Sequence, residues 1–211
     1  MIRVDNLSKN YGNRLVLQGI RLKVSAGECV GLLGPNGSGK TTLIKILATL
    51  LPPTSGEIRL AGHNLRTDKE KIRPKIGVLT HSTFLYENLT AIENLLFYGK
   101  LYPISHLQEK ATELLGIFGL KNRAKDQVRY FSRGMKQRLT LARLFLHEPR
   151  ILLLDEPLTG LDSQGTEDLA RMLQGAKEKR CAIFMATHQT TEVGKIVDRW
   201  LKLEQRQVSS P

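Results

Sequence analysis

The segment GPNGSGKT, from Gly34 to Thr41, combines glycines with one lysine and one threonine in the spacing G-x-x-x-x-G-K-[ST]. Glycines allow backbone N–H groups to curl around phosphate oxygens, and a following helix N-terminus adds partial positive charge. The Lys40 ammonium is placed to reach the outer phosphates of a nucleotide, and the Thr41 hydroxyl suits Mg²⁺. An apolar strand pattern precedes the segment and a helical pattern follows it, so a nucleotide site is favoured over a chance glycine-rich turn. The candidate nucleotide-binding residues are Gly34, Pro35, Asn36, Gly37, Ser38, Gly39, Lys40, Thr41 and Thr42.

Two adjacent carboxylates end a second apolar run, in the sequence ILLLDEP. Asp155, at the predicted strand tip, suits the same Mg²⁺ ion as Thr41. Glu156 would then face a water molecule beside the last phosphate and act as its base. A pair of acidic residues after a strand is weak evidence alone. Far downstream of a phosphate-binding loop, the pair indicates nucleotide hydrolysis.

A third segment, YFSRGMKQR, opens a predicted helix between the first two. Ser132 is a favourable N-cap, and Gly134 leaves the backbone N–H groups of the first turn accessible. Read alone, the segment is an ordinary capped helix. Its place between a phosphate-binding loop and an acidic strand end favours a role at the nucleotide instead.

The scaffold that must position these residues follows from the hydrophobic pattern. Strands are predicted at LVLQGIRLKV, ECVGLLG, GEIRL, KIGVL, RILLLDE and RCAIFMAT. A helix is predicted at KTTLIKILATLL, with Leu43, Leu47 and Leu50 on one face and Pro52-Pro53 ending it. Further helices are expected between residues 90 and 147 and over about 163–177.

Alternation of apolar strands with helices predicts a mostly parallel α/β sheet covered on both faces. The helical block over residues 84–149 interrupts this alternation and is interpreted as an inserted subdomain. The tail EQRQVSSP, residues 204–211, is expected to be loose.

The bulk composition is that of an ordinary globular protein of 211 residues, with 41% hydrophobic and 25% charged residues. No apolar run approaches the length of a membrane helix, and the start MIRVDNLSKN lacks the apolar segment of a secretory signal, so a cytoplasmic protein is expected. Cys29 and Cys181 lie in apolar runs without the paired spacing of a zinc site, and buried, inert thiols are expected.

The net charge of +12 is concentrated between Lys121 and Arg150, where nine Lys and Arg residues face two Asp and Glu residues. Such a stretch suits nucleic acid, an anionic membrane surface or a phosphate-rich ligand, and it also fits a solvated surface. Charge alone leaves these alternatives open.

The order of these motifs resembles the nucleotide-binding domain of ATP-binding-cassette (ABC) proteins, from Tyr11 to about His188. The resemblance implies an α/β P-loop NTPase fold, with a RecA-like, mostly parallel sheet core, an N-terminal antiparallel β part and an inserted helical subdomain. It implies a single ABC ATPase domain over residues 1–211, with a core at 1–83 and 150–211 and a helical signature subdomain at about 84–149. The implied activity is hydrolysis of ATP to ADP and phosphate with Mg²⁺ as cofactor, coupled to transport.

The resemblance also gives FSRGM a role, since it matches the family signature LSGGQ at Ser132 and Gly134. It departs from that signature at Phe131, Arg133 and Met135. In the family this segment reaches the ATP held by a second copy. Ser132, Arg133, Gly134 and Met135 are therefore the candidate residues acting in trans.

Other roles come from the same resemblance. Tyr11, in KNYGNRLVL, takes the place of an aromatic residue that stacks on adenine, although alone it reads as an ordinary strand-end tyrosine. LTGLD puts Asp162 in the loop that crosses between two such domains. His188, in MATHQ, matches the switch histidine that touches the γ-phosphate. Glu156, His188 and Lys40 are thus the candidate catalytic residues, with Thr41 and Asp155 as candidate metal ligands.

The loop after KIGVL departs from the family at the position that senses the γ-phosphate. Family members carry a glutamine there, whereas this chain has His81 followed by Ser82 and no glutamine between Ile76 and Asn94. A neutral imidazole can hydrogen-bond or touch a metal, so His81 could replace the glutamine. Alternatively His81 is a bystander and water fills the gap.

Two segments narrow the resemblance to one branch. THSTFLYENLTAIENLLFYGKLY and YFSRGMKQRLTLARLFLHEPRILLLDEPLTGLD are similar to the ATPase of the bacterial haem exporter of cytochrome c maturation. This implies haem as the substrate, whereas ATPases of drug, lipid and polysaccharide exporters share many of the same features and form the alternative. The implied partners are a second copy of the ATPase domain and integral membrane permease subunits, at the cytoplasmic face of the inner (cell) membrane.

Two other classes are weighed against this interpretation. A soluble ABC ATPase acting on nucleic acid would suit the charge, but the basic stretch lacks interleaved aromatic residues for base stacking, so no nucleic-acid partner is expected. A GTPase would carry an Asn-Lys-x-Asp guanine reader, which the sequence lacks. A small-molecule kinase would not explain FSRGM.

Overall fold

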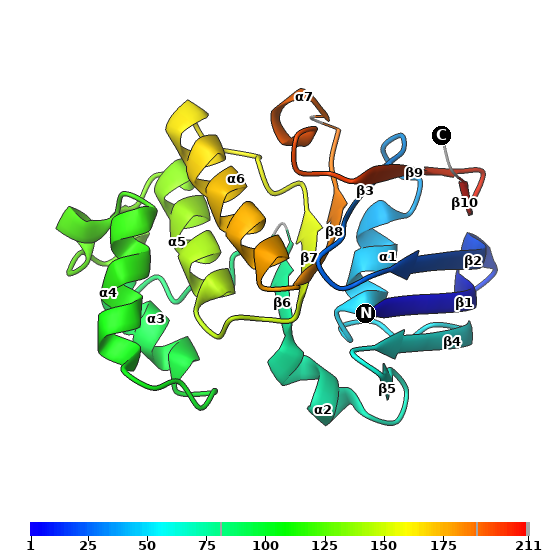
Figure 1. The fold of residues 1–211 in the computed structure, drawn as a ribbon, viewed down its shortest axis with the longest axis horizontal. Coiled ribbons are helices and arrows are strands. Elements are labelled where there is room, and N and C mark those ends of the chain that lie inside the picture. Colours follow the sequence, from blue (N-terminus) through cyan, green and yellow to red (C-terminus); the bar gives the residue numbers. More distant parts are fainter. Residues whose placement is uncertain (81, 189, 210–211) are drawn as a thin grey trace. The chain divides into compact units, whose positions relative to one another are not determined.

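The computed structural model describes residues 1–80, 82–188 and 190–209 (Figure 1). The chain forms two compact units. The core unit comprises Met1–Thr80, Pro149–Pro157 and Leu173–Pro211, and the helical unit comprises His81–Glu148 and Leu158–Met172. The interpretation of 1–211 as one ATPase domain with boundaries at 84 and 149 stays a prediction.

A six-stranded sheet in the order β10-β9-β3-β8-β7-β6 forms the centre of the core unit. Its strands are β3 (Cys29–Leu33), β6 (Ile76–Leu79), β7 (Ile151–Asp155), β8 (Ala182–Ala186), β9 (Arg199–Glu204) and β10 (Gln207–Ser209). Neighbouring strands from β9 to β6 run parallel, and β10 alone pairs antiparallel at the edge. β7 and β8 are buried along their whole length, which explains their uninterrupted apolar sequences. The predicted α/β class with a mostly parallel sheet is confirmed.

A second sheet, antiparallel and in the order β2-β1-β4-β5, lies in the N-terminal part of the core unit (Figure 1). It comprises β1 (Ile2–Tyr11), β2 (Arg14–Val24), β4 (Ser55–Leu60) and β5 (His63–Asn64). The ladder between β1 and β2 is irregular after Val4, Leu7 and Lys9, which matches the shift in alternation along β2, where Leu17 and Ile20 are both buried.

The helix α1 (Lys40–Leu47) packs its apolar face into the core unit. Leu43 and Leu47 are fully buried, and burying one such side chain stabilises a fold by roughly 1.5–3 kcal/mol. The helix ends before the expected Pro52-Pro53, because Thr49 adopts a left-handed conformation, and Leu50 is exposed rather than buried. This anchoring holds the loop that precedes α1 in a fixed position.

The C-terminal residues correct one prediction. Residues 204–209 are not loose, since β9 and β10 form an antiparallel hairpin on the edge of the sheet. Leu201 and Leu203 are buried, and the six-carbon ring of Trp200 lies where a side chain on Gly31 would otherwise point. The absence of a side chain at Gly31 in β3 therefore leaves room for the Trp200 ring of the neighbouring strand β9.

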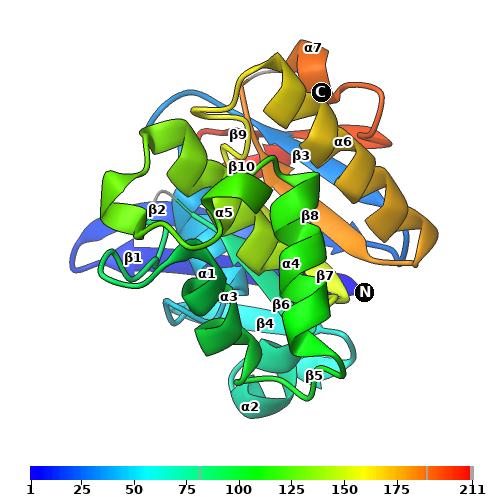
Figure 2. The ribbon, with the colours of Figure 1, turned by 90° about the vertical axis from the view of Figure 1, so that its left-hand side faces the viewer.

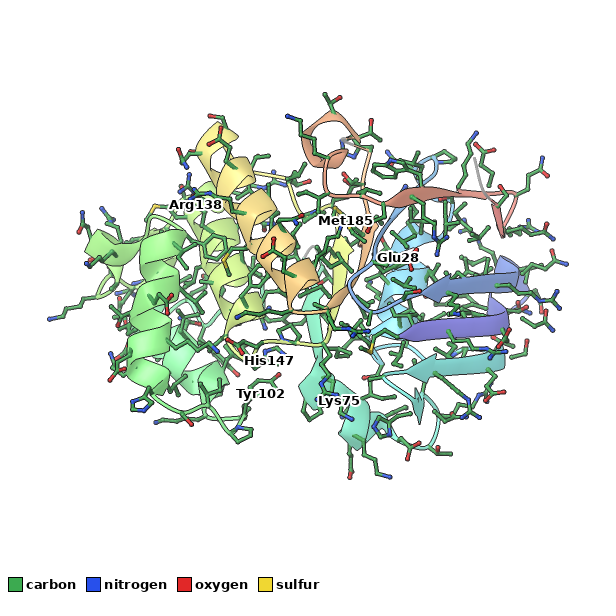
Figure 3. All side chains as sticks on the ribbon, viewed as in Figure 1. Glu28, Lys75, Tyr102, Arg138, His147 and Met185 are labelled. Atoms are coloured by element: carbon green, nitrogen blue, oxygen red, sulfur yellow. The ribbon has the colours of Figure 1, made fainter. Side chains whose placement is uncertain are left out.

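The helical unit contains α3 (Ala91–Gly99), α4 (Leu107–Ile117) and α5 (Arg133–Phe145), which lie side by side in Figure 2. Thr90 begins α3 through a capping box with Glu93. Tyr102 and His147, labelled in Figure 3, stack with ring centroids 4.1 Å apart. The predicted helices of this block are confirmed, with ends shifted by a few residues.

The remaining helices are short, except for α6 (Ser163–Glu178), which begins in the helical unit and ends in the core unit. The short helices are α2 (Lys69–Ile72), α7 (Thr190–Val193) and the 3₁₀ turns Arg73–Lys75, Lys121–Arg123 and Val128–Tyr130. Within the described ranges, no helix combines the length and the apolar character that crossing a membrane requires.

Both cysteines are buried free thiols, as expected. Burial raises the pKa of Cys29 and that of Cys181 to about 12. Since the thiolate is the reactive form, both side chains act as small apolar residues of the core.

Candidate nucleotide site

The site in the core unit lies at the end of the six-stranded sheet where the parallel strands have their carboxyl ends. β3, β8, β7 and β6 are parallel neighbours, so the segments that follow their carboxyl ends meet at the same edge. β3 leads into the phosphate-binding loop, β7 ends at Asp155 with Glu156 next, and β8 leads to His188. Three segments far apart in the sequence thus meet because of strand order.

The phosphate-binding loop between β3 and α1 is curled tightly on itself. The Lys40 ammonium donates hydrogen bonds to the carbonyl oxygens of Gly34 (2.6 Å) and Pro35 (3.2 Å). A Cβ atom on Gly34 would lie 2.5 Å from the Leu203 carbonyl oxygen, so only glycine fits there. Gly39 caps α1 with φ of 111°, a conformation that favours glycine. Lys40 therefore holds the loop in a curled shape through its own carbonyl groups.

The donors around this loop fit a phosphate ligand with Mg²⁺. Among the described residues, the Ser38 hydroxyl is a buried oxygen without a hydrogen-bond partner, inside the cradle that a Cβ on Gly34 would fill. Thr41, in the first turn of α1, and Asp155, at the tip of β7, offer the oxygen ligands that Mg²⁺ prefers. In the described part of the chain no group of three or more His, Cys, Asp or Glu side chains could hold a metal alone. Phosphate oxygens and water would thus complete the coordination of Mg²⁺, as is usual for this ion.

Glu156 and His188 form a pair beside this loop. His188 Nδ1 lies 2.9 Å from Glu156 Oε2, and the His188 backbone N–H donates to the same oxygen at 3.4 Å. The Glu156 side chain is 14% exposed and that of His188 is 68% exposed. Glu156 has φ of 50°, in the left-handed region, while its N–H donates to the Ala186 carbonyl oxygen. The carboxylate is thus fixed at the end of β7, with the imidazole reaching out to solvent.

Tyr11 ends β1 in a hairpin that packs on the phosphate-binding loop. Its side chain is 48% exposed. On the paired strand β2, Leu17 and Val16 approach the loop at Gly39, where a Cβ would lie 2.8 Å from Leu17 Cδ2. The Lys9 ammonium lies over the Tyr11 ring, 5.1 Å from its centroid. The expected base-stacking residue therefore belongs to an element in direct contact with the loop.

The signature segment begins α5 in the helical unit. Ser132 is the N-cap, as predicted, and its Oγ accepts a hydrogen bond from the Met135 backbone N–H at 3.2 Å. Ser132 and Arg133 are exposed, whereas Gly134 is half-buried because a Cβ there would lie 3.0 Å from the Gly160 carbonyl oxygen. The start of α5 is therefore in contact with the loop 158–162.

The carboxylate of Asp162, the last residue of that loop, contacts Gly165 and Arg138. Its Oδ1 accepts a hydrogen bond from the Gly165 backbone N–H at 2.8 Å and forms an ion pair with Arg138 of α5, which is labelled in Figure 3. These contacts, the Gly165 N–H first and then the Arg138 guanidinium, hold the pKa of Asp162 below its ordinary value. Arg138 also donates to the Phe118 carbonyl oxygen at 3.3 Å. One side chain thus ties α5 to the loop and to the end of α4.

A surface pocket of about 340 Å³ lies beside the signature segment. Its walls combine small residues with paired charges, as Arg123 lies 2.6 Å from Asp126 and Arg138 is paired with Asp162. The lining residues are Gly119, Leu120, Arg123, Ser132, Gly134, Met135, Arg138, Gly160 and Asp162. The pocket therefore offers hydroxyl and guanidinium donors at the surface of the helical unit.

The predicted sensor positions are only partly visible. His81 lies outside the described residues. Ser82 is exposed and belongs to the helical unit. Replacement of the missing glutamine by His81 stays a prediction.

The sequence-based reasoning missed two residues, Lys9 beside Tyr11 in the core unit and Arg138 beside Asp162 in the helical unit. Lys9 lies two positions before Tyr11, and Arg138 lies in the same helix as Ser132. The contact of Lys9 with Tyr11 depends on the irregular β1–β2 ladder, which the sequence does not indicate. The pairing of Arg138 with Asp162 depends on a fold contact that no local pattern indicates.

Comparison with known proteins identifies the family. A family model described as ABC transporter matches residues 17–159. The chain belongs to the ABC transporter family.

Curated relatives in the ABC family include the bacitracin transport ATP-binding protein BcrA of Bacillus licheniformis, 41% identical over 94% of this chain. The linearmycin resistance ATP-binding protein LnrL of Bacillus subtilis (strain 168) is 36% identical over 94% of this chain. A Nod factor export ATP-binding protein I of Burkholderia lata is 38% identical over 95% of this chain. The chain spans 65% of the length of BcrA and of LnrL, and 66% of the Burkholderia protein.

Solved ABC structures share the fold. The dimeric structure of MJ0796, a bacterial ABC transporter cassette, has a TM-score of 0.89 and 30% identity, covering 99% of this chain and 97% of that one. A dimeric post-hydrolysis structure of the same cassette, bound to ADP and Pi, has a TM-score of 0.88 and 28% identity, covering 100% and 98%. The predicted P-loop NTPase fold of ABC ATPases is therefore confirmed.

Proposed function

We propose that this chain is the ATP-hydrolysing subunit of an ABC membrane exporter and works as a head-to-tail dimer of nucleotide domains. The observation that carries the proposal is the meeting of the phosphate-binding loop, Asp155 and the Glu156–His188 pair at one edge of the core sheet. A phosphate cradle next to a fixed carboxylate is suited to hydrolysis as well as to binding.

In the proposed reaction, nucleotide phosphates draw the Lys40 ammonium away from the carbonyl groups of Gly34 and Pro35. Tyr11 stacks on the adenine. Thr41 and Asp155 would hold Mg²⁺, which supplies neutralisation of phosphate charge when bound. These residues fix the substrate before any bond is broken.

Glu156 is the proposed base. Its carboxylate accepts a proton as a water oxygen bonds to the γ-phosphorus, and the bond from that phosphorus to the ADP oxygen breaks. The contact with Glu156 holds the His188 imidazole near the reacting group. Lys40 and His188 then stabilise the charge on the transferring phosphoryl group.

The proposed dimer explains the signature segment. Ser132, Arg133, Gly134 and Met135 would meet the phosphates held by a second copy, and the pocket beside them would receive that nucleotide. The two MJ0796 dimer structures support this arrangement, since that cassette shares the fold. A two-fold symmetric dimer would contain two such sites.

Permease subunits are the proposed membrane partners, at the cytoplasmic face of the cell membrane. The helical unit exposes an aromatic cluster of Phe84, Tyr86 and Phe97, which are 50%, 48% and 44% exposed. Tyr86 and Phe97 are in edge contact with ring centroids 4.8 Å apart. Exposed aromatic residues gathered in this way suit a protein partner.

The comparisons favour the alternative substrate class over haem. BcrA, LnrL and the Nod factor protein are named for bacitracin transport, linearmycin resistance and Nod factor export. We therefore favour an exporter of drugs, lipids or polysaccharides, with the haem exporter as the second candidate on the two segments quoted above. Nucleic acid is not proposed as a partner.

The test uses the Glu156→Gln variant of the full chain, because removing the base should abolish hydrolysis while ATP keeps the dimer closed. The variant is expressed in its native host, held with ATP and Mg²⁺, and purified from solubilised membranes with its bound proteins. We expect a multi-span permease and a dimeric ATPase. A permease of the cytochrome-maturation set would restore haem export as the first candidate.

Paired variants separate docking from folding. Glu156→Gln with Tyr86→Ala should keep the dimer and lose the permease. Glu156→Gln with Ile117→Ala, an apolar change at a 37% exposed position of α4, should keep both. Recovery of no membrane protein with any variant would contradict the exporter proposal.

A further inference from the structure

Lys9 is a buried cation held by neutral groups. Lys9 is only 8% exposed. Within the part of the chain that the structure describes, no carboxylate lies at ion-pair distance from the Lys9 ammonium, which donates to the Pro52 carbonyl oxygen at 2.8 Å and covers the Tyr11 ring. Burying a charge is costly unless its contacts compensate, so this placement needs a reason.

The Tyr11 ring is covered by Lys9 and still keeps exposed surface that a ligand can reach. The ammonium lies over the ring at 5.1 Å from the centroid, while 48% of the residue remains exposed. A cation at this distance is attracted by the π electrons and restrains the ring. The exposed part of Tyr11 is then available to a flat base, since bases stack on aromatic rings irrespective of their identity.

Lys9 is fixed relative to the phosphate-binding loop by two routes. Across the β1–β2 ladder it is the partner of Leu17, whose side chain packs against Gly39 of the loop. Its hydrogen bond ends at Pro52, in the segment that follows the loop's helix α1. Lys9 thus connects the Tyr11 ring, the strand β2 that packs against the loop and the segment that follows α1.

We propose that Lys9 is a positioning residue that holds the Tyr11 ring for a purine base, separately from phosphate binding. The proposal rests on the proposed function, in which Tyr11 stacks on adenine. The part of the nucleotide affinity that comes from the base would then depend on Lys9, a residue outside the phosphate-binding loop. The predicted signature is a loss of affinity for ADP with affinity for inorganic pyrophosphate unchanged.

The experiment compares ADP with inorganic pyrophosphate, each titrated calorimetrically with Mg²⁺ into the full chain. Lys9→Gln removes the charge and keeps a donor for the Pro52 carbonyl group, so it is less disruptive than Lys9→Met. We expect Lys9→Gln to raise the ADP dissociation constant about three- to tenfold and to change that of pyrophosphate less than about twofold. Lys9→Arg, which keeps a cation over the ring, should bind ADP as the wild type does.

Lys23→Met is the matched control, since Lys23 is an exposed lysine on β2 of the same sheet. It should bind both ligands normally. Tyr11→Ala should lose ADP affinity, and adding Lys9→Gln to Tyr11→Ala should cause no further loss, because the ring through which Lys9 acts is gone.

The outcomes separate the two proposals. If Tyr11→Ala binds ADP normally, base stacking on Tyr11 is wrong. If Tyr11→Ala weakens ADP but Lys9→Gln does not, only the role of Lys9 is wrong. Equal loss of ADP and pyrophosphate in Lys9→Gln would mean that the residue acts on the phosphate-binding loop or on folding, which also overturns the inference.

Discussion

Glu156 adopts a backbone conformation that its residue type disfavours. Its φ of 50° lies in the left-handed region, where a side chain crowds the following carbonyl group. The position is fixed from both sides, by the N–H bond to Ala186 and by the carboxylate contact with His188. Strain held in place by its surroundings is typical of functional positions, and here it orients the proposed base.

This strain can be measured by comparing two substitutions that both remove the carboxylate. Glu156→Gly should be more stable than Glu156→Ala by about 1 kcal/mol in free energy of unfolding, because glycine tolerates a positive φ. Neither variant should hydrolyse ATP. Urea unfolding of both proteins provides the measurement.

The control pair is at Glu113, an exposed residue within α4. There the order should reverse, with alanine more stable than glycine by about 1 kcal/mol, because glycine is unfavourable inside a helix. The same order at both positions would contradict a strained Glu156.

The helix α5 and the loop 158–162 form one structural element. Gly134 contacts Gly160 at the start of the helix, and Arg138 pairs with Asp162 further along it. In the proposed dimer, the signature residues and the loop would therefore meet the second copy together. A helix that carries a neighbouring loop in this way keeps several ligand-facing groups in register.

The Asp162 contacts predict a pH dependence of stability. The pKa of Asp162 is lowered in the folded state, by the Gly165 N–H first and then by Arg138. Its contribution is therefore present above the unfolded pKa and is lost as the pH falls through the lower folded value. The stability difference between wild type and Asp162→Asn should shrink between about pH 5 and pH 2.

Urea unfolding across this range measures the difference, with Arg138→Met as the companion variant. That variant keeps the Gly165 contact, so it should retain part of the pH dependence. A difference between wild type and Asp162→Asn that stays constant with pH would rule out the proposed contribution of the carboxylate.

At the scale of the whole molecule, a head-to-tail dimer makes a quantitative prediction for mixed variants. Lys40→Ala damages the site that a chain builds itself, and Ser132→Phe damages the site that it completes in its partner. Each protein alone should be inactive. Random pairing gives mixed dimers with one intact site, so an equal mixture should recover up to about a quarter of wild-type ATPase activity.

The control mixture combines Lys40→Ala with Glu156→Gln. Both changes damage the chain's own site, so no mixed dimer contains an intact one and activity should stay absent. Steady-state phosphate release measures both mixtures. Recovery in the control, or none in the first mixture, would contradict the head-to-tail arrangement.

The sequence predicted the sheet edge well because the features involved are local. A buried strand, a glycine-rich turn and a helix are each visible in short windows, and parallel strands then place their ends together. The contact of Lys9 with Tyr11 required knowledge of a bulged ladder and of side-chain direction. The terminal hairpin was missed because β9 is stabilised by pairing with β3 and by packing of Trp200 over Gly31, and the short strand β10 pairs only with β9.

The left-handed conformation of Glu156 also has an evolutionary consequence. Selection for stability alone would favour glycine or asparagine at this position, so a glutamate persists only while its carboxylate is useful to the cell. A descendant that no longer needed turnover would gain stability from the first such replacement. Glycine or asparagine in place of Glu156, directly after the residue that corresponds to Asp155, would therefore indicate a related cassette that no longer hydrolyses ATP and only binds it.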